Sequence, residues 1–180
     1  MRRRLAVAAA LAALGLPPAL AAREPTLFAV SLGAGLAGPL DDDAESSFDS
    51  PVVQLAAGML TDDRTWTVLR LGRVEFASDE VLDGLSAARL DYATVAGEYR
   101  FRQAAYELGL FTGLGLYRLD GDALAGATGG QEALGVVLGF TGDFDVSRRV
   151  SVVGEVDFHY AFLDEVKFYG AALAGVAVHF

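Results

Sequence analysis

The last ten residues of the chain place apolar side chains at alternate positions and end on an aromatic residue. One face of this segment carries Val176, Val178 and Phe180, and the other carries Ala177 and His179. A period of two residues is typical of a β-strand. An apolar strand with a free edge would promote aggregation, so it needs a neighbour. A closed barrel supplies one, because its last strand pairs with its first.

The same alternation recurs along the chain and predicts eight strands. In the clearest case, large apolar side chains alternate with Glu155, Asp157 and His159. Within the third predicted strand, Arg73 and Glu75 interrupt the apolar face, which indicates a bulge or a rim position. The predicted strands are Thr26–Ala37, Val52–Thr61, Thr65–Ala77, Ala88–Arg102, Ala105–Leu119, Glu132–Phe144, Val150–Leu163 and Lys167–Phe180.

The connections between these strands alternate in length. Those after the second, fourth and sixth strands are short, and those after the first, third and fifth are longer and polar. Only the last hairpin, at 164–166, departs from this pattern by being short. An even number of strands with short turns at one end and long loops at the other is typical of transmembrane β-barrels.

The N-terminal segment has the pattern of a secretory signal peptide. Three arginines at 2–4 precede an apolar segment at 5–16, and two prolines and an Ala-Leu-Ala sequence follow it. This pattern predicts a cleaved signal peptide at 1–21 and a single mature domain at 22–180. The chain contains no cysteine, so we expect neither a lipoprotein anchor nor a disulfide.

The composition narrows the class of protein. Three of the 14 basic residues lie in the predicted signal peptide, which leaves 11 basic against 24 acidic residues and a net charge of −13. A charge of this sign argues against a nucleic-acid partner. Hydrophobic residues make up 53% of the chain, yet no later segment is long enough for a membrane-spanning helix. A transmembrane β-barrel explains both the high hydrophobic content and the lack of such a helix, because it crosses the membrane with strands.

Together with the C-terminal Phe180, these features resemble the small eight-stranded outer-membrane β-barrels of the OmpA/OmpX type. The resemblance covers nearly all of the mature chain and rests on architecture and on the terminal signature. It implies an integral protein of the bacterial outer membrane that is surrounded by outer-membrane lipid and lipopolysaccharide. It also implies that Val176, Val178 and Phe180 form the signal that the barrel-assembly machinery reads, and that the protein is a monomer without a cofactor or metal.

The main alternative fold is a soluble eight-stranded cup of the lipocalin kind. In such a cup the apolar face of each strand would point inward. Here the polar-bearing face is rich in Gly and Ala, which suits a narrow interior, whereas the other face is bulky and nearly uncharged. An exterior that faces lipid is therefore favoured.

If the apolar face is outside, the polar residues lie in the lumen. We expect paired charges that fill a narrow interior, because buried charges need partners. A narrow pore or a small-ligand carrier is the alternative, which the many glycines on the same face would accommodate. The polar side chains expected in the lumen are Gln54, Arg70, Glu98, Arg100, Arg102, Glu107, Asp143, Glu155, Asp157 and His159.

Aromatic residues gather near both ends of the predicted strands and suggest two girdles at the membrane interfaces. The group near the short turns includes Trp66, Tyr99, Phe101 and Tyr106, and the group near the long loops includes Phe76, Tyr92, Phe162 and Phe168.

His159 is the strongest candidate for catalysis, because a histidine near carboxylates can act as a general acid or base. Lipid A deacylase barrels resemble this chain in strand number and use a histidine followed two positions later by a nucleophilic serine. Here that position is Ala161. A triad without its nucleophile does not catalyse acyl transfer, so we expect no catalytic residue and no enzyme, with a lipid A-modifying barrel as the alternative.

The predicted long loops are acidic, and their spacing does not match an EF-hand. We therefore expect no metal site there. The most favoured role is structural or interactive, in envelope integrity or in adhesion through these loops. The acidic residues concerned are Asp41, Asp42, Asp43, Glu45, Asp49, Asp79, Glu80, Asp83, Asp120 and Asp122.

Overall fold

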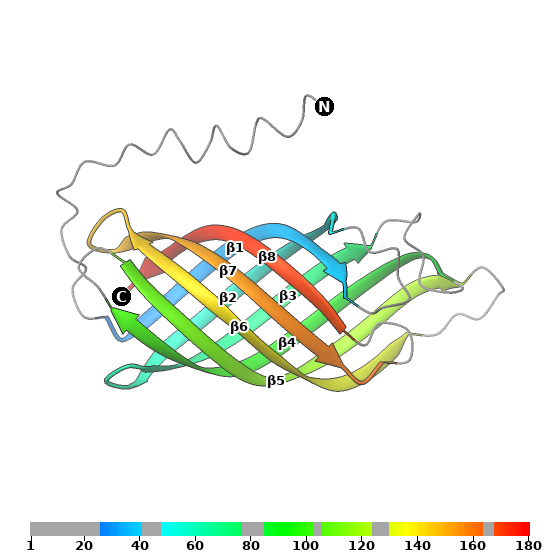
Figure 1. Ribbon diagram of the computed structural model, residues 1–180, viewed down its shortest axis with the longest axis horizontal. Helices are drawn as coiled ribbons and strands as arrows, with labels where there is room; N and C mark the ends of the chain where they lie inside the picture. Colours follow the sequence, from blue (N-terminus) through cyan, green and yellow to red (C-terminus); the bar gives the residue numbers. More distant parts are fainter. Residues whose placement is uncertain (1–25, 41–47, 77–84, 103–105, 124–129, 164–167) are drawn as a thin grey trace, which may run out of the picture.

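The computed structural model describes residues 26–40, 48–76, 85–102, 106–123, 130–163 and 168–180 (Figure 1). The predicted signal peptide, the turn at 103–104, the hairpin at 164–166 and the loop acids at 41–45 and 79–83 lie outside these residues. Across the described ranges, no helix has the length and apolar character needed to cross a membrane.

Eight antiparallel strands form one closed barrel in sequence order. The predicted fold class is confirmed in its strand number and topology, and each predicted strand overlaps an observed one. The strands are β1 (Phe28–Pro39), β2 (Ser50–Asp62), β3 (Thr65–Phe76), β4 (Leu85–Arg102), β5 (Tyr106–Ala123), β6 (Gln131–Asp145), β7 (Val150–Ala161) and β8 (Phe168–His179).

The barrel closes between β1 and β8, which lie side by side in Figure 1. Val30 lies opposite Val178 in this pair. The backbone amide of Phe180 donates to the carbonyl of Phe28 over 2.9 Å, and the amide of Leu27 donates to the carbonyl of Phe180 over 3.0 Å. The apolar terminal strand therefore has a partner along its whole length.

The outward face of the barrel is covered by large apolar side chains. Leu114 in β5 is 68% exposed, and Phe180, directly after β8, is 66% exposed. Along β6, each exposed apolar residue alternates with a buried one. A soluble lipocalin-type cup would place these bulky side chains inside, so the observed arrangement is the reverse of that alternative.

The inward face differs between the two halves of the barrel. Toward the short-turn end it carries the expected charges, such as Arg70 and Glu98. Toward the long-loop end it is apolar and aromatic, with Val74, Leu90 and Leu119 in one buried cluster. The paired charges expected in the lumen are thus accompanied by an apolar layer near the long-loop ends of the strands, which the sequence analysis did not predict.

The third strand contains no bulge at Arg73 or Glu75. Its pairing with β4 runs without a break from Thr65 opposite Tyr99 to Phe76 opposite Ala88. Arg73 and Glu75 continue the outward face, and the residues between and after them point inward. The interruption of the apolar pattern therefore marks the end of the apolar exterior, as the rim alternative predicted.

Candidate functional site: the barrel lumen

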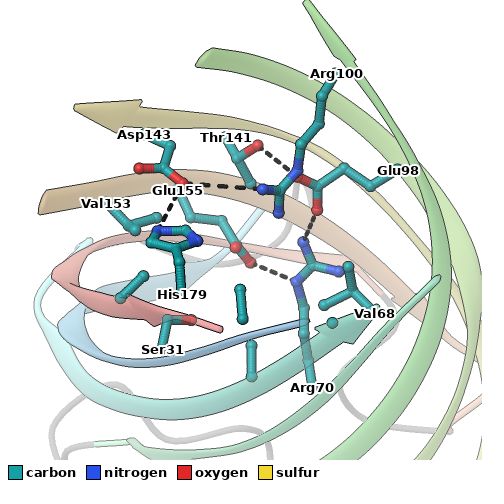
Figure 2. Close-up of a pocket in the computed structure, with 14 residues that line it drawn as sticks. Ser31, Val68, Arg70, Glu98, Arg100, Thr141, Asp143, Val153, Glu155 and His179 are labelled. Atoms are coloured by element: carbon teal, nitrogen blue, oxygen red, sulfur yellow. Dashed lines mark hydrogen bonds and ion pairs between the residues drawn. The ribbon is translucent and has the colours of Figure 1, made fainter. Parts of the chain in front are cut away.

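Arg70 on β3 is the centre of the polar half of the lumen. Its side chain is 1% exposed, and its Nη2 donates to Oε2 of Glu98 on β4 over 2.8 Å (Figure 2). Its Nε donates to Oε1 of Glu155 on β7 over 3.0 Å. The guanidinium also lies over the ring of Phe111, 3.8 Å from its centroid. One arginine thus connects strands from opposite sides of the barrel, and both of its carboxylate partners are buried with it.

Arg100, nearer the short-turn end of β4, extends this network. Its Nε donates to Oε1 of Glu98 over 2.7 Å, and its Nη1 lies 3.4 Å from Glu107 and 3.8 Å from Asp143. The hydroxyl of Thr141 donates to the same Oε1 of Glu98 over 2.9 Å (Figure 2). Glu98 therefore accepts hydrogen bonds from three side chains, which compensates for the loss of its hydration.

A second branch of the network is formed by His179 and the two side chains that it contacts, Ser151 and Asp143. Nε2 of His179 lies 2.8 Å from the hydroxyl of Ser151 and 3.6 Å from Oδ2 of Asp143. Between these groups and Arg70 lies a small cavity of about 30 Å³. That volume is about the space that one water molecule occupies in the liquid.

Gln54 links the polar half of the lumen to the aromatic half. Its Nε2 donates to Oε1 of Glu155 over 3.0 Å, and its Oε1 accepts from the hydroxyl of Tyr92 over 2.8 Å. An amide is suited to this position because it donates and accepts at the same time. The layer of charges and the layer of tyrosines are therefore hydrogen-bonded to each other.

The aromatic layer consists of three tyrosines around His159. The hydroxyl of Tyr117 lies 2.9 Å from Nδ1 of His159. The ring of Tyr169 stacks on the imidazole with centroids 4.5 Å apart, and the ring of Tyr92 lies 4.9 Å from it. All four side chains are buried, so they close the lumen as a packed layer.

Asp157 is a buried carboxylate beside this layer. It is fully buried, and its Oδ1 lies 3.4 Å from Nε2 of His159. Neither carboxylate oxygen makes a hydrogen bond to another described residue. Buried carboxylates without hydrogen bonds are uncommon, which makes Asp157 the least satisfied group of the predicted lumen network.

All eight charged or titratable residues of the predicted network lie on the inward face. The structure brings Arg70, Glu98, Arg100 and Glu155 into direct contact, and it places Glu107 and Asp143 at the edge of the same group. Asp157 and His159 instead belong to the aromatic layer. Arg102 pairs with Asp145 at 3.7 Å near the short-turn end.

The sequence-based assignment missed several lumen residues. Tyr92, which was assigned to an aromatic girdle, is 4% exposed and points inward, and Phe76 is 6% exposed. Tyr117, Tyr169 and His179 were not proposed for the network. Strict alternation along β4, β5 and β8 was the signal that would have identified them.

Trp66 corrects a second girdle assignment. It is 4% exposed, and the guanidinium of Arg100 lies 4.4 Å from its ring centroid inside the barrel. The assignment followed residue type, but alternation places Trp66 on the same face as Val68 and Arg70. A cation over the indole ring also stabilises the charge in a poorly solvated lumen.

The other predicted girdle residues lie on the outward face or at its edge. Tyr99, Phe101 and Tyr106 are 40%, 51% and 40% exposed near the short-turn end. Phe162 is 65% exposed at the opposite end, and Phe168 is half-buried there. At the C-terminus, the predicted assembly residues Val176, Val178 and Phe180 all point outward.

The position two residues after His159 offers no nucleophile. Ala161 is fully buried, and Tyr160 between them points outward. His159 is enclosed by tyrosine rings rather than open to a substrate. Within the described ranges, no group of three or more His, Asp or Glu side chains is arranged to hold a metal ion.

The closed eight-stranded topology, the apolar exterior and the narrow, filled lumen define the fold of small outer-membrane β-barrels. Neisserial surface protein A has this fold, with a TM-score of 0.68 and 18% identity over 85% of this chain and 97% of that one. The attachment invasion locus protein Ail of Yersinia pestis matches with a TM-score of 0.61 and 14% identity, over 87% and 100% of the two chains. The N-terminal barrel domain of Pseudomonas aeruginosa OprF matches with a TM-score of 0.62 and 14% identity over the same shares. No protein-family model and no curated protein matches the sequence.

Proposed function

We propose that this protein is a sealed β-barrel of the bacterial outer membrane with a structural or surface-interaction role. The filled lumen carries this proposal. Two successive layers of buried side chains lie in the interior, the charges around Arg70 and the tyrosines around His159. A barrel of this kind supplies a stable membrane scaffold and holds its outer loops in place.

The outer-membrane location follows from the pattern of the exterior. The outward face carries a band of large apolar side chains around the barrel, with aromatic side chains such as Tyr106 and Phe162 at its two ends. Such a band with aromatic borders fits a bilayer. The likeness to solved outer-membrane barrels supports the same location. The signal peptide predicted at 1–21 would deliver the chain there.

A surface role through the loops remains part of the proposal. Ail, one of the proteins with the same fold, is described as an attachment and invasion protein and has been solved with a heparin analogue. The loops of the present chain are acidic, so a polyanionic glycan of that type is a poor match for them. A cationic or metal-bridged partner suits them better.

We also propose that the protein is not an enzyme. The histidine that resembles the lipid A deacylase motif is enclosed, and Ala161 stands at the nucleophile position. Mass spectrometry of lipid A from cells with and without the protein is expected to show the same acylation. Loss of an acyl chain on expression would contradict this part of the proposal.

The sealed lumen is tested by conductance in planar bilayers. The purified protein is expected to give no stable single-channel current, because neither layer leaves a passage for hydrated ions. A triple variant, Tyr92→Ala with Tyr117→Ala and Tyr169→Ala, removes the aromatic layer. Ion current through this variant would mean that the tyrosines block the lumen. No current would mean that the layer around Arg70 is sufficient to block it.

The matched control changes two tyrosines on the outward face, Tyr99→Ala with Tyr106→Ala, and is expected to stay silent. All variants are compared after heat-modifiable gel migration has shown that they are folded. Stable, substantial currents through the unmodified protein would overturn the proposal and favour the narrow-pore alternative.

A further inference from the structure

Two rows of alternating charge cross the outward face of the barrel on β3, β4, β5 and β6. The first row runs in register through Arg73, Asp91, Arg118 and Glu132. The second row, one step nearer the long-loop end, runs through Glu75, Arg89 and Asp120. Opposite charges thus lie side by side on neighbouring strands, which stabilises the pairing of these strand ends.

These charged rows are held by short contacts but stay open to solvent. Nε of Arg73 donates to Oδ1 of Asp91 over 2.6 Å, and Nη2 of Arg89 donates to Oδ2 of Asp120 over 3.0 Å. The side chains of Arg73, Arg89 and Arg118 are 47%, 46% and 58% exposed. The three guanidinium groups are therefore ordered and accessible together.

Arg118 has the greatest unused capacity to donate. Its Nε donates to Asp120 over 3.0 Å, while its Nη1 lies 3.9 Å from Glu132. Neither Nη atom makes a hydrogen bond to another described residue. A guanidinium whose terminal amino groups make no short hydrogen bond within the protein can donate both of them to a phosphate.

The charged rows begin directly where the apolar exterior ends. The row just below them runs in register through Leu71, Ala93, Leu116 and Leu134. Leu116 and Leu134 are 63% and 64% exposed. In a bilayer, the boundary between these rows lies at the depth where acyl chains meet charged headgroups.

An open groove of about 330 Å³ lies at this boundary. Its outward-facing lining combines Ala93 and Leu116 with Asp91, Arg118 and Glu132. The small side chain of Ala93 leaves room between larger neighbours on β4, β5 and β6. The groove is therefore apolar toward the membrane centre and charged toward the long-loop end.

Among the described residues, this feature is absent from the side of the barrel formed by β1 and β8. The described outward positions of β8 and β1 carry no charged side chain. In Figure 1, β4 and β5 also reach further than the other strands toward the long-loop end. These longer strands carry the second charged row. On this side of the barrel, a polar surface therefore lies between the apolar band and the long-loop end.

We propose that this groove and its arginines bind the phosphorylated, acylated headgroup of lipopolysaccharide. This proposal rests on the outer-membrane location proposed above. An acyl chain lies against Ala93 and Leu116, and a phosphate accepts hydrogen bonds from Arg118, with Arg73 and Arg89 beside it. The phosphate and hydroxyl groups of this glycolipid match a surface that alternates donors with acceptors.

The two rows carry three arginines and four carboxylates, so a divalent counterion has to accompany the phosphate. Each of the three arginines is already paired with at least one carboxylate. Lipopolysaccharide phosphates also carry divalent cations, and Asp91 or Glu132 supplies the oxygen ligands that such cations prefer. The site therefore suits a phosphate with its counterion better than a bare anion.

The test measures binding of bis-phosphorylated lipid A to the folded, full-length mature protein in detergent by native mass spectrometry. The wild-type protein is expected to retain lipid A, and Arg118→Gln is expected to weaken binding about tenfold because charge-assisted hydrogen bonds are lost. A second variant, Ala93→Phe, fills the groove without changing any charge and is expected to weaken binding as well. The matched control is Arg64→Gln, which removes an exposed arginine at the opposite end of the barrel.

Three outcomes would overturn the proposal. In the first, Arg118→Gln and Ala93→Phe bind lipid A as tightly as Arg64→Gln does. In the second, the wild-type protein binds dephosphorylated lipid A as tightly as the phosphorylated form. In the third, phosphatidylglycerol at equal concentration displaces lipid A from the wild-type protein. If lipid A binding fails while the protein remains a sealed outer-membrane barrel, only this inference is wrong. If the protein is absent from the outer membrane, the proposed function fails first.

Discussion

Arg70 lies between two carboxylates that are as deeply buried as it is itself. Its guanidinium lies 2.8 Å from Glu98 and 3.0 Å from Glu155, so one arginine is the ion-pair partner of both carboxylates. Buried ion pairs often add little net stability, yet removal of one partner leaves a charge without compensation. The contribution of each charged lumen residue to stability therefore depends on whether its ion-pair partners are present.

At this scale we predict that Arg70→Met lowers the free energy of unfolding by about 3–5 kcal/mol, the usual result of breaking a buried pair. Denaturant titration of the barrel refolded in detergent measures the loss. The triple variant Arg70→Met with Glu98→Gln and Glu155→Gln is expected to recover much of it, because no uncompensated charge then remains.

Arg73→Met is the matched control for this prediction. Arg73 also bonds an aspartate on the neighbouring strand, but its side chain is half exposed, and exposed ion pairs contribute little. Its unfolding midpoint is therefore expected to stay close to that of the wild type. An equal loss of stability in Arg70→Met and Arg73→Met would contradict the account of the lumen.

At the scale of the element, the seam between β1 and β8 depends on close approach of two backbones. A Cβ at Gly35 would overlap the carbonyl oxygen of Ala172 and lie 2.7 Å from Cα of Leu173. Gly33, on the same strand and face, has room, because its added Cβ would lie 3.6 Å from the nearest atom. Glycine is thus required at one of these two positions and not at the other.

We therefore predict that Gly35→Ala impairs closure and that Gly33→Ala does not. The Gly35 variant is expected to refold more slowly and to show less of the heat-modifiable form on gels, because the last strand must separate from the first to admit the methyl group. Equal yields of folded protein from the two variants would show that the seam is looser than its backbone spacing indicates.

Much of the strand arrangement follows from alternation alone. The predicted β3, Thr65–Ala77, and the observed Thr65–Phe76 differ by one residue. The end of β5 was placed at Leu119, four residues early, because Asp120 begins a polar segment with the composition of a loop. Asp120 instead lies opposite Arg89 on β4, and this register follows from pairing geometry rather than from composition.

At the scale of the whole molecule, the barrel combines an apolar exterior with a lumen closed in two different ways. Alternation predicted which residues face inward, including all eight of the proposed network. It did not predict how they divide into a charged layer and a tyrosine layer, because strand tilt decides which inward residues share a level. The error at Trp66 has the same origin, since residue type was given more weight than position.

The central claim, a membrane-spanning barrel with long loops outward and a closed lumen, is tested most directly by cysteine accessibility. The chain contains no cysteine, so each single substitution reports on one place. In intact cells, a water-soluble maleimide is expected to label Glu132→Cys and not Arg64→Cys until the outer membrane is permeabilised. Leu114→Cys in the lipid-facing band and Val137→Cys in the lumen are expected to stay unlabelled in both conditions and to react only after heat denaturation. Labelling of Leu114→Cys as fast as Glu132→Cys in the folded protein would mean that the apolar exterior faces water, and would contradict the account.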